Sequence, residues 1–136
     1  MNNSLKINSN EFNSIAYKIF IIFCILIFLD TIYISFTYNL LFENVLHKIN
    51  NTKDIKIRYL PTLFFYVIFA TGIYFLLIQE KKSLNYSFLF GVFIYLFYEL
   101  TNYAIIEAWD LKIVILDSLW GGILVFLTVM SANSII

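Results

Sequence analysis

Three acidic residues, Asp30, Glu99 and Asp117, stand inside long apolar stretches of the sequence. An ionisable side chain near the middle of a membrane-spanning helix costs roughly 2.5–3.5 kcal/mol on insertion scales, so such residues are candidates for function. A buried carboxyl group can hold a proton, bind a cation or act as a general acid or base. Without basic neighbours, three carboxylates in a low dielectric do not all stay ionised. The sequence therefore predicts that some of them are protonated or that a cation binds between them.

Each acid has a polar or aromatic partner three residues later, and residues at that spacing share one face of a helix. Thr101 lies beside one of these pairs. The predicted polar layer comprises Asp30, Tyr33, Glu99, Thr101, Asn102, Asp117 and Trp120. Three interpretations of this layer remain open: a hydrogen-bonded network that fixes helix register, an ion or proton site, and a catalytic site.

The residues that bind transition metals are scarce. Cys24 is the single cysteine and His47 the single histidine, and no CxxC pair or second histidine accompanies either. Zinc sites need three or four such ligands. Phosphate-binding, dinucleotide-binding and zinc-protease motifs are also missing from the sequence. The sequence predicts neither a metal nor a cofactor.

The composition is that of a membrane protein. Of the 136 residues, 61% are hydrophobic and 13% charged, whereas soluble domains are about 45–50% apolar and about 25% charged. The mean hydropathy is +0.82. The formal net charge is zero, so no nucleic-acid partner is expected. The predicted partner is the lipid bilayer, crossed several times by the chain.

Four segments are apolar enough, and close enough to the roughly 20 residues needed, to cross a bilayer as helices. The predicted spans are residues 15–38, 60–79, 86–107 and 111–132, within one domain that covers residues 15–132 and follows a polar tail at 1–14. The fold class is therefore an all-α membrane protein with four transmembrane helices in two antiparallel hairpins.

The connections between the spans carry further predictions. The short charged turn at residues 79–83 predicts that the second and third spans also lie antiparallel. Trp109, between the last two spans, is predicted to anchor the chain at the membrane interface. Gly91, Gly121 and Gly122 predict a close approach of helix backbones.

The connection at residues 39–59 is longer than the other two. Its first part, residues 40–49, has apolar side chains at helical spacing and predicts a short amphipathic helix at the interface. Its second part is basic. Lysine and arginine are almost equally divided between the two sides of the membrane, and the rule that positive loops are cytoplasmic slightly favours a cytoplasmic position for this connection.

Counting residues from the ends of the spans places the three acids at one depth. The first and third spans end on the side of the membrane where the second and fourth begin. At 1.5 Å per residue, each acid lies roughly 10–12 Å from that same face. The sequence thus predicts that the first, third and fourth spans share one acidic layer.

The same residues carry a family resemblance. The stretch from Tyr98 to Ala104, then Trp109, then the stretch from Asp117 to Gly121 resemble the pattern of the DUF2177 family of small bacterial and viral membrane proteins. The stretch from Leu29 to Tyr33 resembles the family's first-helix element. Glu99 replaces the usual aspartate, and Tyr33 stands where tryptophan is common. The resemblance implies a four-helix membrane protein and no established activity.

The function expected first is that of a non-enzymatic membrane protein with an acidic site for a cation or a proton. A form that conducts ions is expected to be a homo-oligomer, because four helices leave little room for an ion pathway within a single chain. The alternatives are a membrane-embedded enzyme that acts on a lipid, through Asp30, Glu99 or Asp117, and a structural or assembly protein of a membrane.

Overall fold

The computed structural model describes residues 8–51 and 56–136, and every regular element within them is a helix. The prediction of an all-α fold is thereby confirmed. The elements are α1 (Ser9–Thr37), the π-helical turn η1 (Tyr38–Phe42), α2 (Glu43–Asn50), α3 (Tyr59–Ile73), the π-helical turn η2 (Tyr74–Ile78), α4 (Leu84–Ile105) and α5 (Leu111–Ile135).

Four continuous helical stretches of the described chain are long and apolar enough to cross a membrane, which confirms the predicted number of spans. They are Ser9–Asn50, Tyr59–Ile78, Leu84–Ile105 and Leu111–Ile135. The first begins inside the segment predicted to be a polar tail, because the Asn8 side chain accepts a hydrogen bond from the Asn10 backbone and caps α1. The rest of that tail, residues 1–7, lies outside the described residues.

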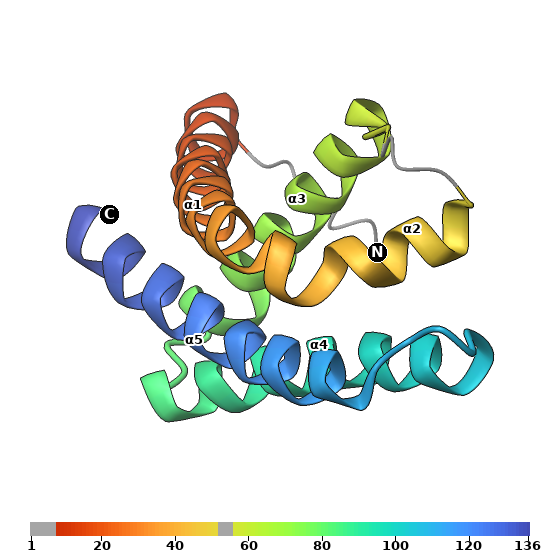
Figure 1. The fold of residues 1–136 in the computed structure, drawn as a ribbon. Coiled ribbons are helices and arrows are strands. Elements are labelled where there is room, and N and C mark those ends of the chain that lie inside the picture. The colour runs from red at the N-terminus through yellow and green to blue at the C-terminus, as the bar shows by residue number, and fades with distance from the viewer. Residues whose placement is uncertain (1–7, 52–55) are drawn as a thin grey trace, which may run out of the picture.

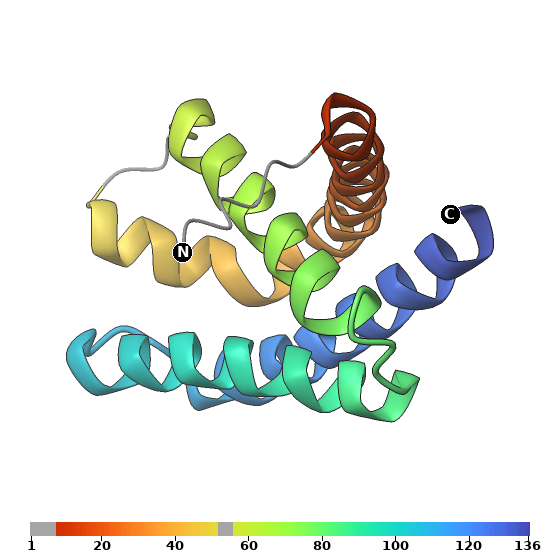
Figure 2. The same ribbon diagram turned by 180° about the vertical axis from the view of Figure 1, so that it is seen from behind.

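Two helix pairs make up the bundle. α4 runs back along α5, and α1 packs against both α3 and α5 (Figures 1 and 2). The second and third predicted spans do not form the expected antiparallel pair, because α3 and α4 diverge from their connecting turn (Figure 2). The short turn joins the ends of the two helices and does not fix the angle between them.

Glycines hold α4 and α5 close together, as the sequence predicted. A Cβ atom at Gly91 would overlap the carbonyl oxygen of Gly121, and a Cβ atom at Gly121 would overlap the ring of Tyr95. Small residues at such contacts let helix backbones approach closely in a membrane, where van der Waals packing holds helices together. α4 therefore takes α5 as its neighbour along most of its length.

The outer surface of the bundle is strongly apolar. Large side chains such as Phe28, Phe36, Phe93 and Phe97 are exposed. A soluble protein rarely leaves a continuous apolar surface of this kind open to water. The chain is a multi-pass membrane protein, and these side chains contact lipid.

The first span bends sharply into α2. The hydroxyls of Ser35 and Thr37 donate to backbone carbonyls four residues earlier, at 2.7 Å each, which tends to bend a helix. The π-helical turn η1 follows at once, and such turns are a known cause of kinks. α2 consequently lies across the end of the α4–α5 pair (Figure 1).

α2 is the amphipathic helix that the sequence predicted. Its Val45 is buried in a cluster with Trp109, Ile113 and Val114. The helix ends at Asn51, which adopts a left-handed conformation with φ 52°, as asparagine does more readily than most residues. Its predicted place at the membrane interface stays a prediction. Part of the basic segment that follows, residues 52–55, lies outside the described residues.

Candidate functional site

Asp30 joins three helices through its carboxyl group. The Tyr66 hydroxyl of α3 donates to Oδ2 at 2.5 Å, and the Trp120 indole of α5 donates to Oδ1 at 2.9 Å. The Asp30 side chain is 7% exposed. Both of its oxygens are thus occupied by donors from other helices, which holds α1 in register with α3 and α5.

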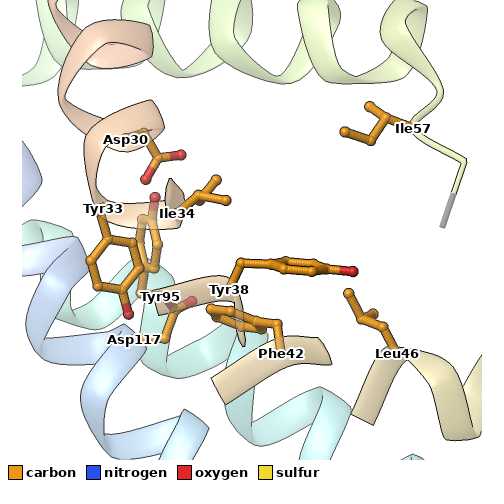
Figure 3. A pocket seen from close by; sticks show the side chains of 9 residues that line it. All are labelled: Asp30, Tyr33, Ile34, Tyr38, Phe42, Leu46, Ile57, Tyr95 and Asp117. Carbon is orange, nitrogen blue, oxygen red and sulfur yellow. The ribbon is translucent and has the colours of Figure 1, made fainter. Parts of the chain in front are cut away.

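Tyr33 extends this arrangement by one helical turn. Its ring stacks on that of Trp120, with 4.4 Å between the ring centres and 5° between the planes. Its hydroxyl is buried without a hydrogen-bond partner in the described part of the chain, and it points toward Asp117 (Figure 3). An unpartnered buried hydroxyl is costly, so Tyr33 has hydrogen-bonding capacity left for a ligand.

Asp117 differs from Asp30 in its surroundings. It is 8% exposed, and its carboxyl faces a cavity (Figure 3). Tyr66, Trp120 and Trp109 donate to the other two acids and not to Asp117. The polar groups closest to Asp117 are the Tyr33 hydroxyl and the Glu99 carboxyl. Asp117 thus lies beside a second carboxyl group.

Glu99 lies deeper in the protein. It is 1% exposed, and its Oε2 accepts a hydrogen bond of 2.7 Å from the Trp109 indole. Trp109 itself is buried in a cluster with Val45 of α2. Its backbone N–H bonds to the Ile106 carbonyl in the turn before α5. Its predicted role as an interface anchor stays a prediction.

Replacement of Trp109 by phenylalanine is expected to destabilise the protein by about 1 kcal/mol, because phenylalanine keeps the apolar packing and loses the donor to Glu99. Replacement by alanine also leaves a cavity and is expected to cost about 3–5 kcal/mol. Thermal unfolding in mild detergent measures both. Equal stability of the phenylalanine variant and the wild type would show that the bond to Glu99 contributes nothing.

Two residues of the predicted layer stand apart from it. Thr101 is exposed, and its hydroxyl donates to the backbone carbonyl of Phe97 at 2.8 Å. Asn102 is half-buried, and its backbone carbonyl accepts the bond that ends α4, from Ile106. Neither side chain joins a hydrogen bond of the layer within residues 8–51 and 56–136.

A cavity of about 440 Å³ adjoins the layer (Figure 3). Asp30 and Asp117 line it, and Glu99 does not. Tyr95, which the sequence places one helical turn before Glu99, also lines it and points its hydroxyl toward Asp30. The remaining described wall is formed by Tyr33, Ile34, Tyr38, Phe42, Leu46 and Ile57.

The acids do not form a metal centre. In the described part of the chain, no three side chains of histidine, cysteine, aspartate or glutamate are grouped so that they could hold a metal ion. Asp30 and Asp117 share the cavity, while Glu99 approaches Asp117 alone. The three acids are therefore spread along the layer. Asp30 and Asp117 lie at the cavity, and Glu99 lies away from it.

Four spanning helices, an apolar outer surface and a buried acidic layer define a multi-pass membrane protein with a polar interior. More specifically, the chain belongs to the family described as predicted membrane protein (DUF2177), whose model matches residues 15–134. This confirms the resemblance seen in the sequence. No curated protein and no solved structure matches the chain.

Proposed function

We propose that this protein binds a positive charge, either a proton or a cation, at Asp117 inside the membrane. One observation carries the proposal: Asp117 is buried, faces a cavity and lies beside a second carboxyl group, that of Glu99. Two neighbouring carboxylates in a low dielectric repel each other unless a proton or a cation lies between them.

The charges around the cavity support this proposal. Among the described residues, its lining includes two aspartates and no lysine, arginine or histidine. A neighbouring cavity of about 440 Å³ shares Asp30, Asp117, Ile34 and Tyr95 with it, and its described lining residues also include no basic one. A proton or a bound cation supplies the positive charge that these lining residues do not.

The two aspartates have different roles in this proposal. Asp30 already accepts bonds from Tyr66 and Trp120, so it positions the helices. Asp117 faces the cavity beside the Tyr33 hydroxyl and exchanges the charge. Tyr33 provides a hydroxyl that can donate to Asp117 or accept a proton from a ligand.

Replacement of Asp117 by asparagine is expected to abolish the infrared absorption of a protonated carboxyl that the Asp117–Glu99 pair gives, because a single remaining acid has no second carboxylate to share a proton with. The measurement is infrared difference spectroscopy of protein in phosphatidylcholine nanodiscs during a pH change. Glu80→Gln removes an exposed carboxyl in the α3–α4 turn and should leave the spectrum of the buried pair unchanged.

Identical spectra for the wild type and Asp117→Asn would refute the proposal. A transport version of it has its own readout, which is proton or cation flux into vesicles that contain the protein. Flux that persists in both Asp117→Asn and Glu99→Gln would rule that version out. A conducting form is expected to be a homo-oligomer, which the mass of the protein in detergent would reveal.

A second candidate function is that of a membrane-embedded enzyme, and one observation favours it. A groove of about 730 Å³ between α1 and α3 shares Ile34 and Ile57 with the acidic cavity. An apolar substrate could enter from the bilayer through this groove and meet Asp117 as a general acid or base. Incubation with a membrane lipid extract, followed by mass spectrometry, tests this against Asp117→Asn.

A further inference from the structure

We infer that the acidic cavity binds a single-chain amphipathic ammonium ion, with its charged head at Asp117 and Asp30 and its alkyl chain in the groove between α1 and α3. The inference rests on the proposed function, because it names the molecule that brings the positive charge. The inference names the kind of ligand. The proposed function would also hold if a proton alone bound at Asp117.

The head-group end is suited to an organic cation. Asp117 and Asp30 are 8% and 7% exposed and are the charged groups that the described lining residues present to the cavity. Aromatic rings of Tyr33, Tyr38 and Tyr95 also line it, and the faces of such rings attract ammonium groups. Carboxylates and aromatic rings together favour an ammonium ion over a neutral or anionic head group.

The size of the cavity also indicates an organic ligand. Its volume of about 440 Å³ falls in the range of roughly 300–1,000 Å³ that small-molecule sites occupy. A bare metal ion needs far less space and several close ligands, and the described residues do not group three suitable side chains. A molecule with a bulky cationic head fits both the volume of the cavity and the small number of grouped metal-binding side chains.

A place for the alkyl chain adjoins the acidic cavity. The groove between α1 and α3 is lined by apolar side chains that include Ile27, Leu60 and Leu63. Ile34 and Ile57 line both this groove and the acidic cavity. One molecule can therefore place its head in the cavity and its chain along the groove.

The same lining disfavours ordinary phospholipids. A phosphate group beside Asp30 and Asp117 would meet two acids and no basic side chain among the described lining residues, and like charges repel strongly in a low dielectric. The ligand carries a net positive charge, so phosphatidylcholine and phosphatidylethanolamine are poor competitors for the site. Nanodiscs of phosphatidylcholine thus provide a suitable background for a binding experiment.

The experiment uses the full chain in phosphatidylcholine nanodiscs and three probes with one chain length: decyltrimethylammonium, decanol and decyl sulfate. Tryptophan fluorescence reports binding, because Trp120 stacks on Tyr33 at the edge of the cavity. Empty nanodiscs correct for partition into lipid. We expect saturable binding of the cation at least tenfold tighter than that of decanol, and no saturation by decyl sulfate.

Two variants test the two ends of the site. Asp117→Asn should weaken binding of decyltrimethylammonium at least tenfold, while Glu80→Gln, which removes an exposed carboxyl far along the chain, should not. Leu63→Phe narrows the groove and does not touch the lining of the acidic cavity. It should weaken binding of the decyl cation and leave that of tetramethylammonium, which has no chain, unchanged.

The possible failures are distinguishable. Equal affinity for decanol and decyltrimethylammonium, or unchanged binding in both Asp117→Asn and Leu63→Phe, overturns the inference. If infrared spectra show a shared proton at Asp117 and Glu99 but no alkylammonium saturates the protein, the inference fails and the proposed function stands. If neither the spectra nor the binding depends on Asp117, both fail.

Discussion

A single methyl group added at Gly91 is expected to force α4 away from α5 and to destabilise the protein by about 3 kcal/mol, the upper end of the usual range for overpacked contacts. The new Cβ atom would overlap the carbonyl oxygen of Gly121, which belongs to the backbone and cannot rotate away. Alanine favours a helix over glycine by only about 1 kcal/mol, so the clash decides the sign. Unfolding in mixed micelles, followed by circular dichroism, measures the change.

Gly72 supplies the matched control. An added Cβ at this position of α3 meets no other atom within 4 Å. Gly72→Ala is therefore expected to be neutral or to stabilise the protein by up to about 1 kcal/mol through helix propensity. If Gly91→Ala proved as stable as Gly72→Ala, the close approach of α4 and α5 would be wrong.

Replacement of Asp30 by leucine is expected to loosen α1 from both α3 and α5. The change leaves the Tyr66 hydroxyl and the Trp120 indole without their acceptor. Hydrogen bonds between membrane helices contribute on average about 0.6 kcal/mol and at most about 1.7 kcal/mol each. Two of them give an expected loss of about 1–3 kcal/mol, measurable by thermal unfolding and by hydrogen exchange of the α1 backbone.

Asp30→Asn is the conservative counterpart. Its amide oxygen can still accept from Trp120, and its amide N–H can donate to the Tyr66 hydroxyl. It should retain most of the stability that leucine loses. A leucine variant more stable than the wild type would contradict the prediction, and it would mean that the protein keeps this acid at the expense of stability.

The spans could be predicted from the sequence because their signal is local. Each is a run of apolar residues of about the length that a bilayer requires. The depths of Asp30 and Asp117 followed from the same count, and the structure places both at one cavity. Helical rise fixes the depth of a side chain well, even when the neighbours of its helix are unknown.

The contacts within the polar layer depend on how the helices pack, and local sequence patterns do not contain that information. Trp109 donates to Glu99 from a turn that its backbone bond to Ile106 helps to close, and its position between two spans contained no sign of this contact. Thr101 satisfies its hydroxyl on the backbone of its own helix, as threonine commonly does. A helical wheel shows which residues share a face and does not show which face meets a neighbour.

The course of the helices was the hardest part to foresee. Composition gave no sign of the π-helical turn η1, which bends the chain between α1 and α2 and brings Tyr38 and Phe42 to the cavity. The short turn at residues 79–83 also suggested an antiparallel pairing of α3 and α4 that the structure does not have. Crossing angles depend on side-chain packing over the whole interface.

The two bonds at Asp30 also constrain how the protein is made. Its partners lie 36 and 90 residues further along the chain. At roughly 5–20 residues per second of synthesis, the ribosome reaches Trp120 some 5–18 seconds after Asp30. The first helix thus enters the membrane with its acid unpaired, and only the arrival of the last helix completes the pairing. Assembly of the interior has to wait for the end of translation, so any factor that shields Asp30 in that interval would act on the nascent chain and not on the finished protein.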